Sequence, residues 1–222
     1  IAPNRDPREP SLPDFDEAHL FPTTHEHQDE VIDRVIDIVT ANGVDLIVPC
    51  RDDDVLACAR LIEREPSLRS KTLAGSVATA QAMLDKYESW KFSERHGVPF
   101  AASVLLDAPD LAERLEQSIP FPVIVKPRTG FASRSAIIVN NMSEILRLAP
   151  SKQLVAQEFL GDPSGINDYV ASVTSGAVPL FHSFEGEKVS IQTIIGPDGK
   201  HDEIVVTRNV MRAGVSVNVE ID

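Results

Sequence analysis

The order of apolar strands and amphipathic helices between residues 99 and 159 constrains the fold of this chain more than any other feature. Short runs of β-branched residues alternate there with segments that have helical spacing and capping residues. The predicted elements are a strand over 99–105, a helix over 110–118, strands over 123–127 and 136–140, a helix over 143–149 and a strand over 154–159. This order is a split β-α-β-β-α-β unit. We expect the loop after residue 127 to connect two adjacent central strands of its sheet.

The stretch 122–135, PVIVKPRTGFASRS, carries a lysine from a strand directly into a loop of small and hydroxyl residues. Three β-branched residues predict the strand, Pro127 ends it, and Lys126 therefore lies at the strand end. Gly130 allows backbone amides to approach an anion, and Ser133 adds a hydroxyl donor. Because no GxxxxGK[ST] motif is present, a phosphate-binding loop and a surface hairpin with a solvated lysine are equally compatible with this stretch alone.

The first part of the chain predicts helix, strand and helix after a proline-rich lead-in. Thr23 and Glu26 form a capping-box pattern at the start of the first helix, Gly43 ends it, and Asp52 is the expected cap of the second. The predicted elements are an extended or poorly ordered lead-in over 1–22, a helix over 23–43, a strand over 44–49 and a helix over 53–65. This alternation is typical of part of a doubly wound parallel sheet, with its beginning missing.

The pattern changes after Gly75, where we expect a domain boundary. Two short helices follow, over 76–84 and 86–96, and lead into the split unit. The segment 168–222 alternates strands with turns, including the turn 196–199 (GPDG), and predicts an antiparallel sheet.

The composition favours a soluble, acidic protein. The 34 acidic and 21 basic residues give a net charge of −13, which argues against nucleic acid or an anionic membrane as partner. No run approaches 18 apolar residues, and the N-terminal segment lacks the apolar core of a signal peptide, so we expect a cytoplasmic protein. Cys50 and Cys58 fit no common zinc motif and are expected to be free thiols.

The succession Asp85-Lys86, then PVIVKPR with its small-residue loop, then VAQEFLG, then an acidic residue at 168 resembles the ATP-grasp superfamily. The likeness covers roughly residues 31 to 217 and is greatest to carbamoyl-phosphate-synthase-like enzymes and biosynthetic carboxylate–amine ligases. It implies an α/β and α+β architecture. The implied domains are a partial Rossmann-like pre-ATP-grasp domain over 1–75, an ATP-grasp N-terminal lobe over 76–160 and the start of the C-terminal lobe over 161–222.

The resemblance also implies roles for individual residues. Glu158 would make a side-chain contact to adenine, although the register between Gln157 and Glu158 stays open. Arg212 resembles the arginine of an R-x-G-x-S segment at the acceptor end and would share catalysis with Lys126. The implied nucleotide-binding residues are Lys86 and Lys126 at the phosphates, Ser133 in the covering loop, Gln157, Glu158, Phe159 and Leu160 at the adenine, and Asp168 at the ribose.

The resemblance implies ATP and Mg²⁺ as cofactors. The glutamate and E-x-N ligands that the family places on magnesium do not follow Arg212, so the metal ligands are unassigned and the chain is expected to be truncated at both ends. The implied reaction is phosphorylation of a carboxylate or bicarbonate to an acyl phosphate, which an amine attacks. An alternative is a nucleotide-binding regulatory or subunit module without a complete metal site, and a purely structural α/β domain is a third. The acceptor is not predicted, and a homo-oligomer is left open.

Overall fold

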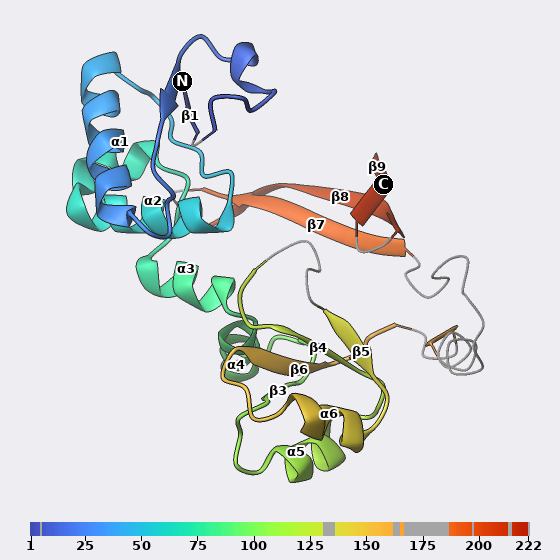
Figure 1. Ribbon diagram of the computed structural model, residues 1–222. Coiled ribbons are helices and arrows are strands. Elements are labelled where there is room, and N and C mark those ends of the chain that lie inside the picture. Colours follow the sequence, from blue (N-terminus) through green and yellow to red (C-terminus); the bar gives the residue numbers. More distant parts are fainter. Residues whose placement is uncertain are drawn as a thin grey trace. The chain divides into compact units, whose positions relative to one another are not determined.

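The computed structural model describes residues 1–4, 6–130, 136–161, 165–166, 187–196, 198–212 and 215–221 (Figure 1). The chain forms two compact units, Ile1–Leu84 and Asp85–Asp222, which we describe separately. The domain limits expected after residues 75 and 160 stay predictions.

The lead-in of the first unit contains regular structure. Strand β1 (Ala2–Asn4) pairs in parallel with β2 (Ala18–Leu20), and a 3₁₀ helix, η1 (Leu12–Asp14), lies between them. Residues 2–4 and 18–20 are therefore extended, as one of the two expected alternatives had it, and a backbone ladder orders them although their composition does not.

Two helices form the core of the first unit. Helices α1 (Gln28–Asn42) and α2 (Asp52–Arg64) contribute Ile32, Val39 and Leu61 to one buried cluster. Gly43 ends α1 in the left-handed conformation with φ 60°, as expected.

The expected helix starts are wrong in detail. Helix α1 begins at Gln28, because the amides of Glu26 and His27 instead bond to the Thr23 carbonyl oxygen in a separate turn, at 3.2 and 3.0 Å. The N-cap position of α2 is Arg51, so the residue expected as its cap, Asp52, is its first helical residue.

The segment expected as a strand over 44–49 forms one parallel bridge, between Ile47 and Thr72. Leu46 and Val48 are each 53% exposed, so the described residues provide no sheet for them to pack into. The unit continues with η2 (Pro66–Lys71) and ends with α3 (Val77–Leu84).

The second unit begins with the split β-α-β-β-α-β arrangement, in the predicted order. Its elements, after helix α4 (Lys86–Arg95), are β3 (Ser103–Leu105), α5 (Leu111–Ser118), β4 (Val123–Pro127), β5 (Ile137–Val139), α6 (Met142–Leu148) and β6 (Leu154–Glu158). The strands form an antiparallel sheet in the order β3-β6-β4-β5. Strand β5 is therefore an edge strand, and the loop after β4 joins a central strand to an edge strand rather than two central ones.

One face of this sheet is apolar and covered by α5 and α6, which lie on the same side of it (Figure 1). Leu115 and Ile145 from the helices pack with Val123, Val125 and Ala156 from the strands, and each is 1% exposed or less. Because side chains alternate along a strand, the residues between these point to the opposite face, which carries Lys126 and Gln157.

A three-stranded antiparallel sheet forms the last described part of the chain. Its strands are β7 (Glu187–Ile195), β8 (His201–Arg212) and β9 (Val215–Ile221). This confirms the expected antiparallel pattern for residues 187–221, with Gly199 at φ 76° in the turn between β7 and β8.

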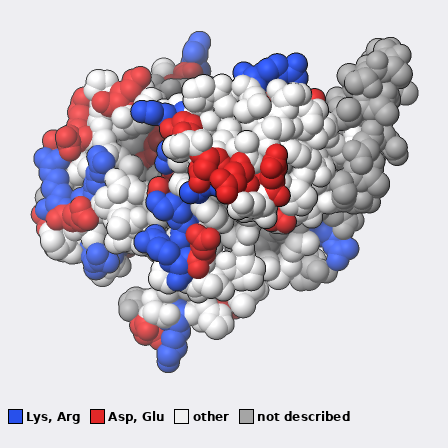
Figure 2. Space-filling view, turned by 90° about the horizontal axis from the view of Figure 1, so that it is seen from below, with Lys and Arg blue, Asp and Glu red and all other residues white. Residues whose placement is uncertain are grey.

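Acidic and basic side chains are interspersed over the face drawn in Figure 2. Within the described ranges, no helix is long and apolar enough to cross a membrane.

Candidate functional site

Lys126 lies on the second face of the four-stranded sheet, opposite the face that packs on α5 and α6, and its neighbours there, Val155 and Gln157, are buried. Its neighbour Ile124 pairs with Gln157 across the β4–β6 ladder, so Lys126 and Gln157 share this face. The Lys126 Nζ donates a hydrogen bond to Gln157 Oε1. The lysine is half-buried, and Gln157 is 7% exposed.

A buried serine fixes the orientation of the Gln157 amide. The Gln157 Nε2 donates to Ser103 Oγ at 2.8 Å, and Ser103 Oγ donates to the Ala101 carbonyl at 3.1 Å. Since Ser103 is 1% exposed, this contact has no competing water on the serine side. The amide nitrogen therefore faces β3, and the amide oxygen faces Lys126.

Lys86, the first residue of α4, reaches the loop that follows β4. Its backbone amide donates to the Arg128 carbonyl at 2.9 Å, and its Nζ donates to the carbonyls of Gly130 and Arg128 at 2.9 and 3.4 Å. The pKa of Lys126 is lowered, first by burial and then by the positive charge of Lys86. Two lysines from segments about 40 residues apart in sequence are thus close enough for their charges to interact.

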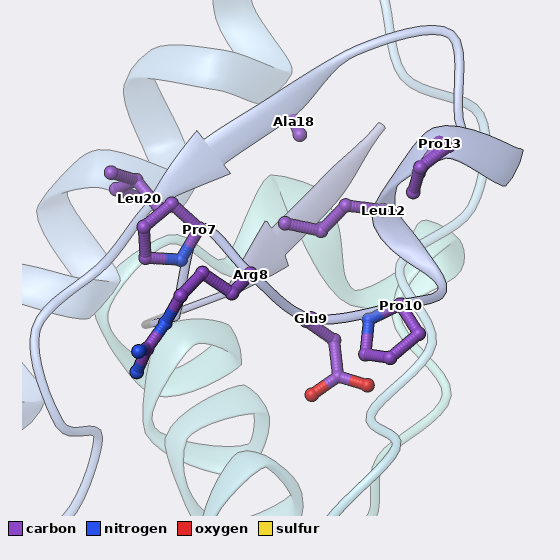
Figure 3. Close-up of a pocket in the computed structure, with 8 residues that line it drawn as sticks. All are labelled: Pro7, Arg8, Glu9, Pro10, Leu12, Pro13, Ala18 and Leu20. Carbon is purple, nitrogen blue, oxygen red and sulfur yellow. The ribbon is translucent and has the colours of Figure 1, made fainter.

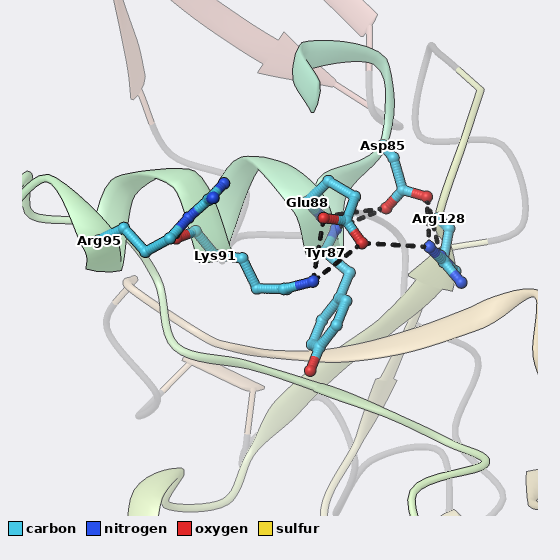
Figure 4. Close-up of polar contacts among 6 residues, drawn as sticks. All are labelled: Asp85, Tyr87, Glu88, Lys91, Arg95 and Arg128. Carbon is cyan, nitrogen blue, oxygen red and sulfur yellow. Dashed lines mark hydrogen bonds and ion pairs between the residues drawn. The ribbon is translucent and has the colours of Figure 1, made fainter. Parts of the chain in front are cut away.

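An ion pair joins the same two segments beside the lysines (Figure 4). Arg128 Nη2 lies 2.7 Å from Asp85 Oδ2, and Arg128 Nε donates to the same oxygen at 2.9 Å. The other Asp85 oxygen caps α4 by accepting from the amides of Tyr87 and Glu88. Burial alone raises the pKa of Asp85, but the hydrogen bonds from Arg128 and from these amides outweigh burial and lower it.

The remaining predicted site residues are less closely gathered. Glu158 Oε2 accepts from the Ala102 amide at 3.3 Å, so its side chain bonds to the segment preceding β3. Phe159 and Leu160 follow the end of β6, and Leu160 is 74% exposed.

Three predicted residues cannot be placed with their side chains. Ser133 and Asp168 lie outside the described residues. Arg212 has a described backbone, paired with Val215 at the end of β8, while its side chain lies outside the description. Among the described residues, the structure therefore brings together Lys86, Lys126 and Gln157.

Sequence reasoning missed Ser103 as a site residue. The signal was a hydroxyl residue in a strand whose neighbours, Ala102 and Val104, are apolar. Its partner lies 54 residues away, and no local pattern encodes a pair at that separation.

An open pocket lies in the lead-in of the first unit (Figure 3). It is lined largely by proline and leucine, including Pro7, Pro10 and Leu12. Arg8 in its wall is paired with Asp6 at 3.1 Å. The pocket contains none of the predicted site residues.

The described residues contain no group of three His, Cys, Asp or Glu side chains that could hold a metal ion. Glu220 lies on β9 and accepts a hydrogen bond from Asn218 at 3.0 Å, and Asp222 lies outside the described residues. The described residues therefore assign no magnesium ligand.

Comparison with known proteins identifies the fold. No protein-family profile matches the chain. A pyruvate carboxylase subunit from Methanothermobacter thermautotrophicus is 30% identical over 135 residues, which are 60% of this chain and 27% of that protein. The N5-carboxyaminoimidazole ribonucleotide synthetase of Thermus thermophilus aligns with a TM-score of 0.63 and 19% identity, over 96% of this chain and 49% of that one. The chain has the ATP-grasp fold.

A second solved structure supports the ATP-grasp assignment. The biotin carboxylase domain dimer of Hydrogenobacter thermophilus 2-oxoglutarate carboxylase, in complex with MgADP, ADP and bicarbonate, aligns with a TM-score of 0.55 and 19% identity. It covers 90% of this chain and 42% of that one. The chain thus spans 27% of the curated relative and less than half of each of these solved structures.

Proposed function

We propose that this chain is the nucleotide-binding part of an ATP-dependent ligase of the carbamoyl-phosphate-synthase-like type. The observation that carries the proposal is the pair Lys86 and Lys126, held near each other at the edge of a largely buried sheet face. Among the described residues, Lys126 bonds to the neutral Gln157, and the groups that shift its pKa include no acidic side chain. Two neighbouring ammonium groups favour a ligand with several negative charges, such as the phosphates of ATP.

The adenine would lie toward the end of β6. Phe159 and Leu160 follow the last residue of that strand, where the backbone leaves the sheet, so their amide and carbonyl groups can meet the adenine edge. In this arrangement Glu158 would line the same end, the Gln157 side chain would lie between the adenine and the phosphates beside Lys126, Asp168 would bond the ribose, and Ser133 would cover the phosphates.

The proposed reaction proceeds in two steps. A carboxylate or bicarbonate oxygen takes the γ-phosphoryl group, the bond from that phosphorus to the ADP oxygen breaks, and an acyl phosphate forms. An amine then attacks the acyl carbon, phosphate leaves, and the amine nitrogen loses a proton. Lys86 and Lys126 would neutralise charge on the transferring group, and Arg212 would hold the acceptor. The Hydrogenobacter domain was solved with bicarbonate bound, which supports this acceptor class.

The proposal is tested by following ADP release from ATP in the presence of bicarbonate or a panel of carboxylates with an amine. The ligase reading predicts ADP release that depends on the acceptor and is lost in Lys126→Met. The matched control is Lys152→Met, because Lys152 is exposed in the turn before β6. ATP binding without acceptor-dependent ADP release would instead identify a nucleotide-binding regulatory or subunit module.

Location and assembly are further parts of the proposal. The acidic composition supports a cytoplasmic protein, which cell fractionation would test. The Hydrogenobacter domain was solved as a dimer, which supports a homo-oligomer here, and light scattering of the purified chain would test it.

A further inference from the structure

We infer that the ion pair between Asp85 and Arg128 is a positioning device that holds Lys86 and Lys126 together for binding a nucleotide's phosphates. The inference rests on the proposed function, because it assigns the two lysines to one polyanionic ligand. Neither Asp85 nor Arg128 is proposed to touch the ligand.

The ion pair lies beside both lysines in sequence and in space. Asp85 directly precedes Lys86, and Arg128 follows Lys126 by two residues. The two members of the pair are 43 positions apart, so their contact joins the start of α4 to the end of β4. The ion pair therefore acts alongside the hydrogen bonds from Lys86 to the Arg128 and Gly130 carbonyls, which join the same two segments.

The geometry makes the pair more rigid than an ordinary surface contact. Arg128 approaches one Asp85 oxygen with two nitrogens, at 2.7 and 2.9 Å, while the other oxygen caps α4. Both carboxylate oxygens are therefore engaged. The side chains are 26% and 17% exposed, compared with 45% and 44% for the Arg114–Asp110 pair on α5. Solvent screens the first pair less, so it holds its geometry more firmly.

Other contacts orient the Arg128 guanidinium and backbone. The Tyr87 ring lies 5.9 Å from the guanidinium carbon, and Glu88 Oε1 lies 3.9 Å from Arg128 Nη2 (Figure 4). The Arg128 amide donates to the Gln153 carbonyl at 2.9 Å, and its own carbonyl accepts from the Lys86 amide. Arg128 thus ties together α4, β4 and the turn before β6.

The Asp85–Arg128 ion pair opposes the repulsion between the positive charges of Lys86 and Lys126. Lys126 is desolvated and is further disfavoured in its charged form by Lys86. The Lys86 Nζ is also bonded to the Gly130 and Arg128 carbonyls, and the ion pair supports these contacts against the repulsion by fixing the start of α4 and the Arg128 backbone. Holding the two charges in place before the ligand arrives reduces the ordering that binding requires.

Two substitutions separate the ion pair from the helix cap. Asp85→Asn keeps an N-cap side chain that can accept from the Tyr87 and Glu88 amides but removes the charge that holds Arg128. Arg128→Gln removes the other partner and leaves Asp85 intact. The matched control is Arg114→Gln, which breaks the exposed ion pair on α5.

Two measurements test the inference. The first is titration of ¹³Cε-labelled Lys126 by NMR without nucleotide, because its pKa reports how closely Lys86 approaches. Both single variants should raise this pKa toward its ordinary value, while Arg114→Gln should leave it unchanged. The second is ATP affinity by calorimetry, which should fall roughly tenfold in each single variant, with no further loss in the double variant.

The outcomes separate the inference from the proposed function. If the wild-type chain binds ATP and all variants bind it equally, with Lys126 titrating as in wild type, the positioning role is wrong and the proposed function stands. If the wild-type chain does not bind ATP, the proposed function is wrong, and the Asp85–Arg128 ion pair then has no role in phosphate binding. In that case the Lys126 titration still decides whether the pair holds the lysines together.

Discussion

The replacement Gln157→Glu tests whether the positive charge of Lys126 is needed for phosphate binding. It replaces the side-chain amide nitrogen with a carboxylate oxygen and leaves the size of the side chain almost unchanged. In the native chain the Gln157 oxygen accepts from Lys126 without neutralising it. A carboxylate there would pair with Lys126 and add one negative charge next to the proposed phosphate position. For a phosphate about 6 Å from the new charge, with an effective dielectric of about 20, the repulsion is near 3 kcal/mol before salt screening. After screening we expect a loss of about 2 kcal/mol, or roughly 30-fold in ATP affinity.

The same replacement has a second cost in stability. Gln157 Nε2 donates to Ser103 Oγ, whose own proton goes to the Ala101 carbonyl. A glutamate oxygen in place of that nitrogen would face the serine oxygen without a donor. A buried unsatisfied polar contact of this kind lowers the free energy of unfolding by about 1–3 kcal/mol.

The assay is calorimetric titration of ATP and of adenosine, with urea unfolding of the same variants. ATP affinity should fall much more than adenosine affinity, because adenosine carries no phosphate. Gln117→Glu is the matched control, since Gln117 bonds to Glu113 at 3.0 Å on the exposed surface of α5. An unchanged ATP affinity in Gln157→Glu, or an equal loss in the Gln117 variant, would refute the reasoning.

Three further predictions concern stability and reactivity. Ile145→Ala, at a site 0% exposed, should lower the free energy of unfolding by about 2–5 kcal/mol in urea titration, whereas the neighbouring Leu146→Ala, at 56% exposed, should change it by less than about 0.5 kcal/mol. The pKa of Asp85 is lowered in the folded chain, so its stabilising contribution is present above the unfolded value and is lost as the pH falls from about 4 through the folded value. Acid unfolding of Asp85→Asn should accordingly depend less on pH in that window, and equal dependence would contradict the ion pair. Burial raises the pKa of the Cys58 thiol to about 11, so a thiol reagent at pH 8 should modify the exposed Cys50 and leave Cys58 unreacted until the chain unfolds.

The sequence predicts the local elements of the split unit well, for identifiable reasons. A β-branched run predicts β4, and the helix expected over 143–149 is found as α6, one residue earlier at each end. The strand order is not predictable in the same way. Strand β6, last in sequence, pairs between β3 and β4, and this depends on packing among distant residues.

The errors in the first unit have a common cause. The pattern at Thr23 and the apolar run over 44–49 are good local signals, yet the backbone around Thr23 forms a separate turn and the apolar run forms one bridge. Local propensity is a weak guide where tertiary contacts decide the outcome.

The site is predictable only in part. Lys126 follows from its position at a strand end, and Lys86 follows from the resemblance to the ATP-grasp superfamily. The contacts that orient them, from Ser103 to Gln157 and from Asp85 to Arg128, join residues 54 and 43 positions apart. Such pairs form only when elements far apart in sequence pack together, and a local pattern does not reveal which distant side chains will meet.

The central claim is that Lys126 binds the phosphates of a nucleotide, and equilibrium binding of ATP tests it most directly. The account predicts that the wild-type chain and Lys152→Met bind ATP with the same affinity and are stabilised by it. ATP at 100 times its dissociation constant should add about 2.7 kcal/mol to the free energy of unfolding. Lys126→Met should lose most of this affinity while remaining folded. Equal ATP binding by Lys126→Met and the wild-type chain, or no binding by either, would contradict the account.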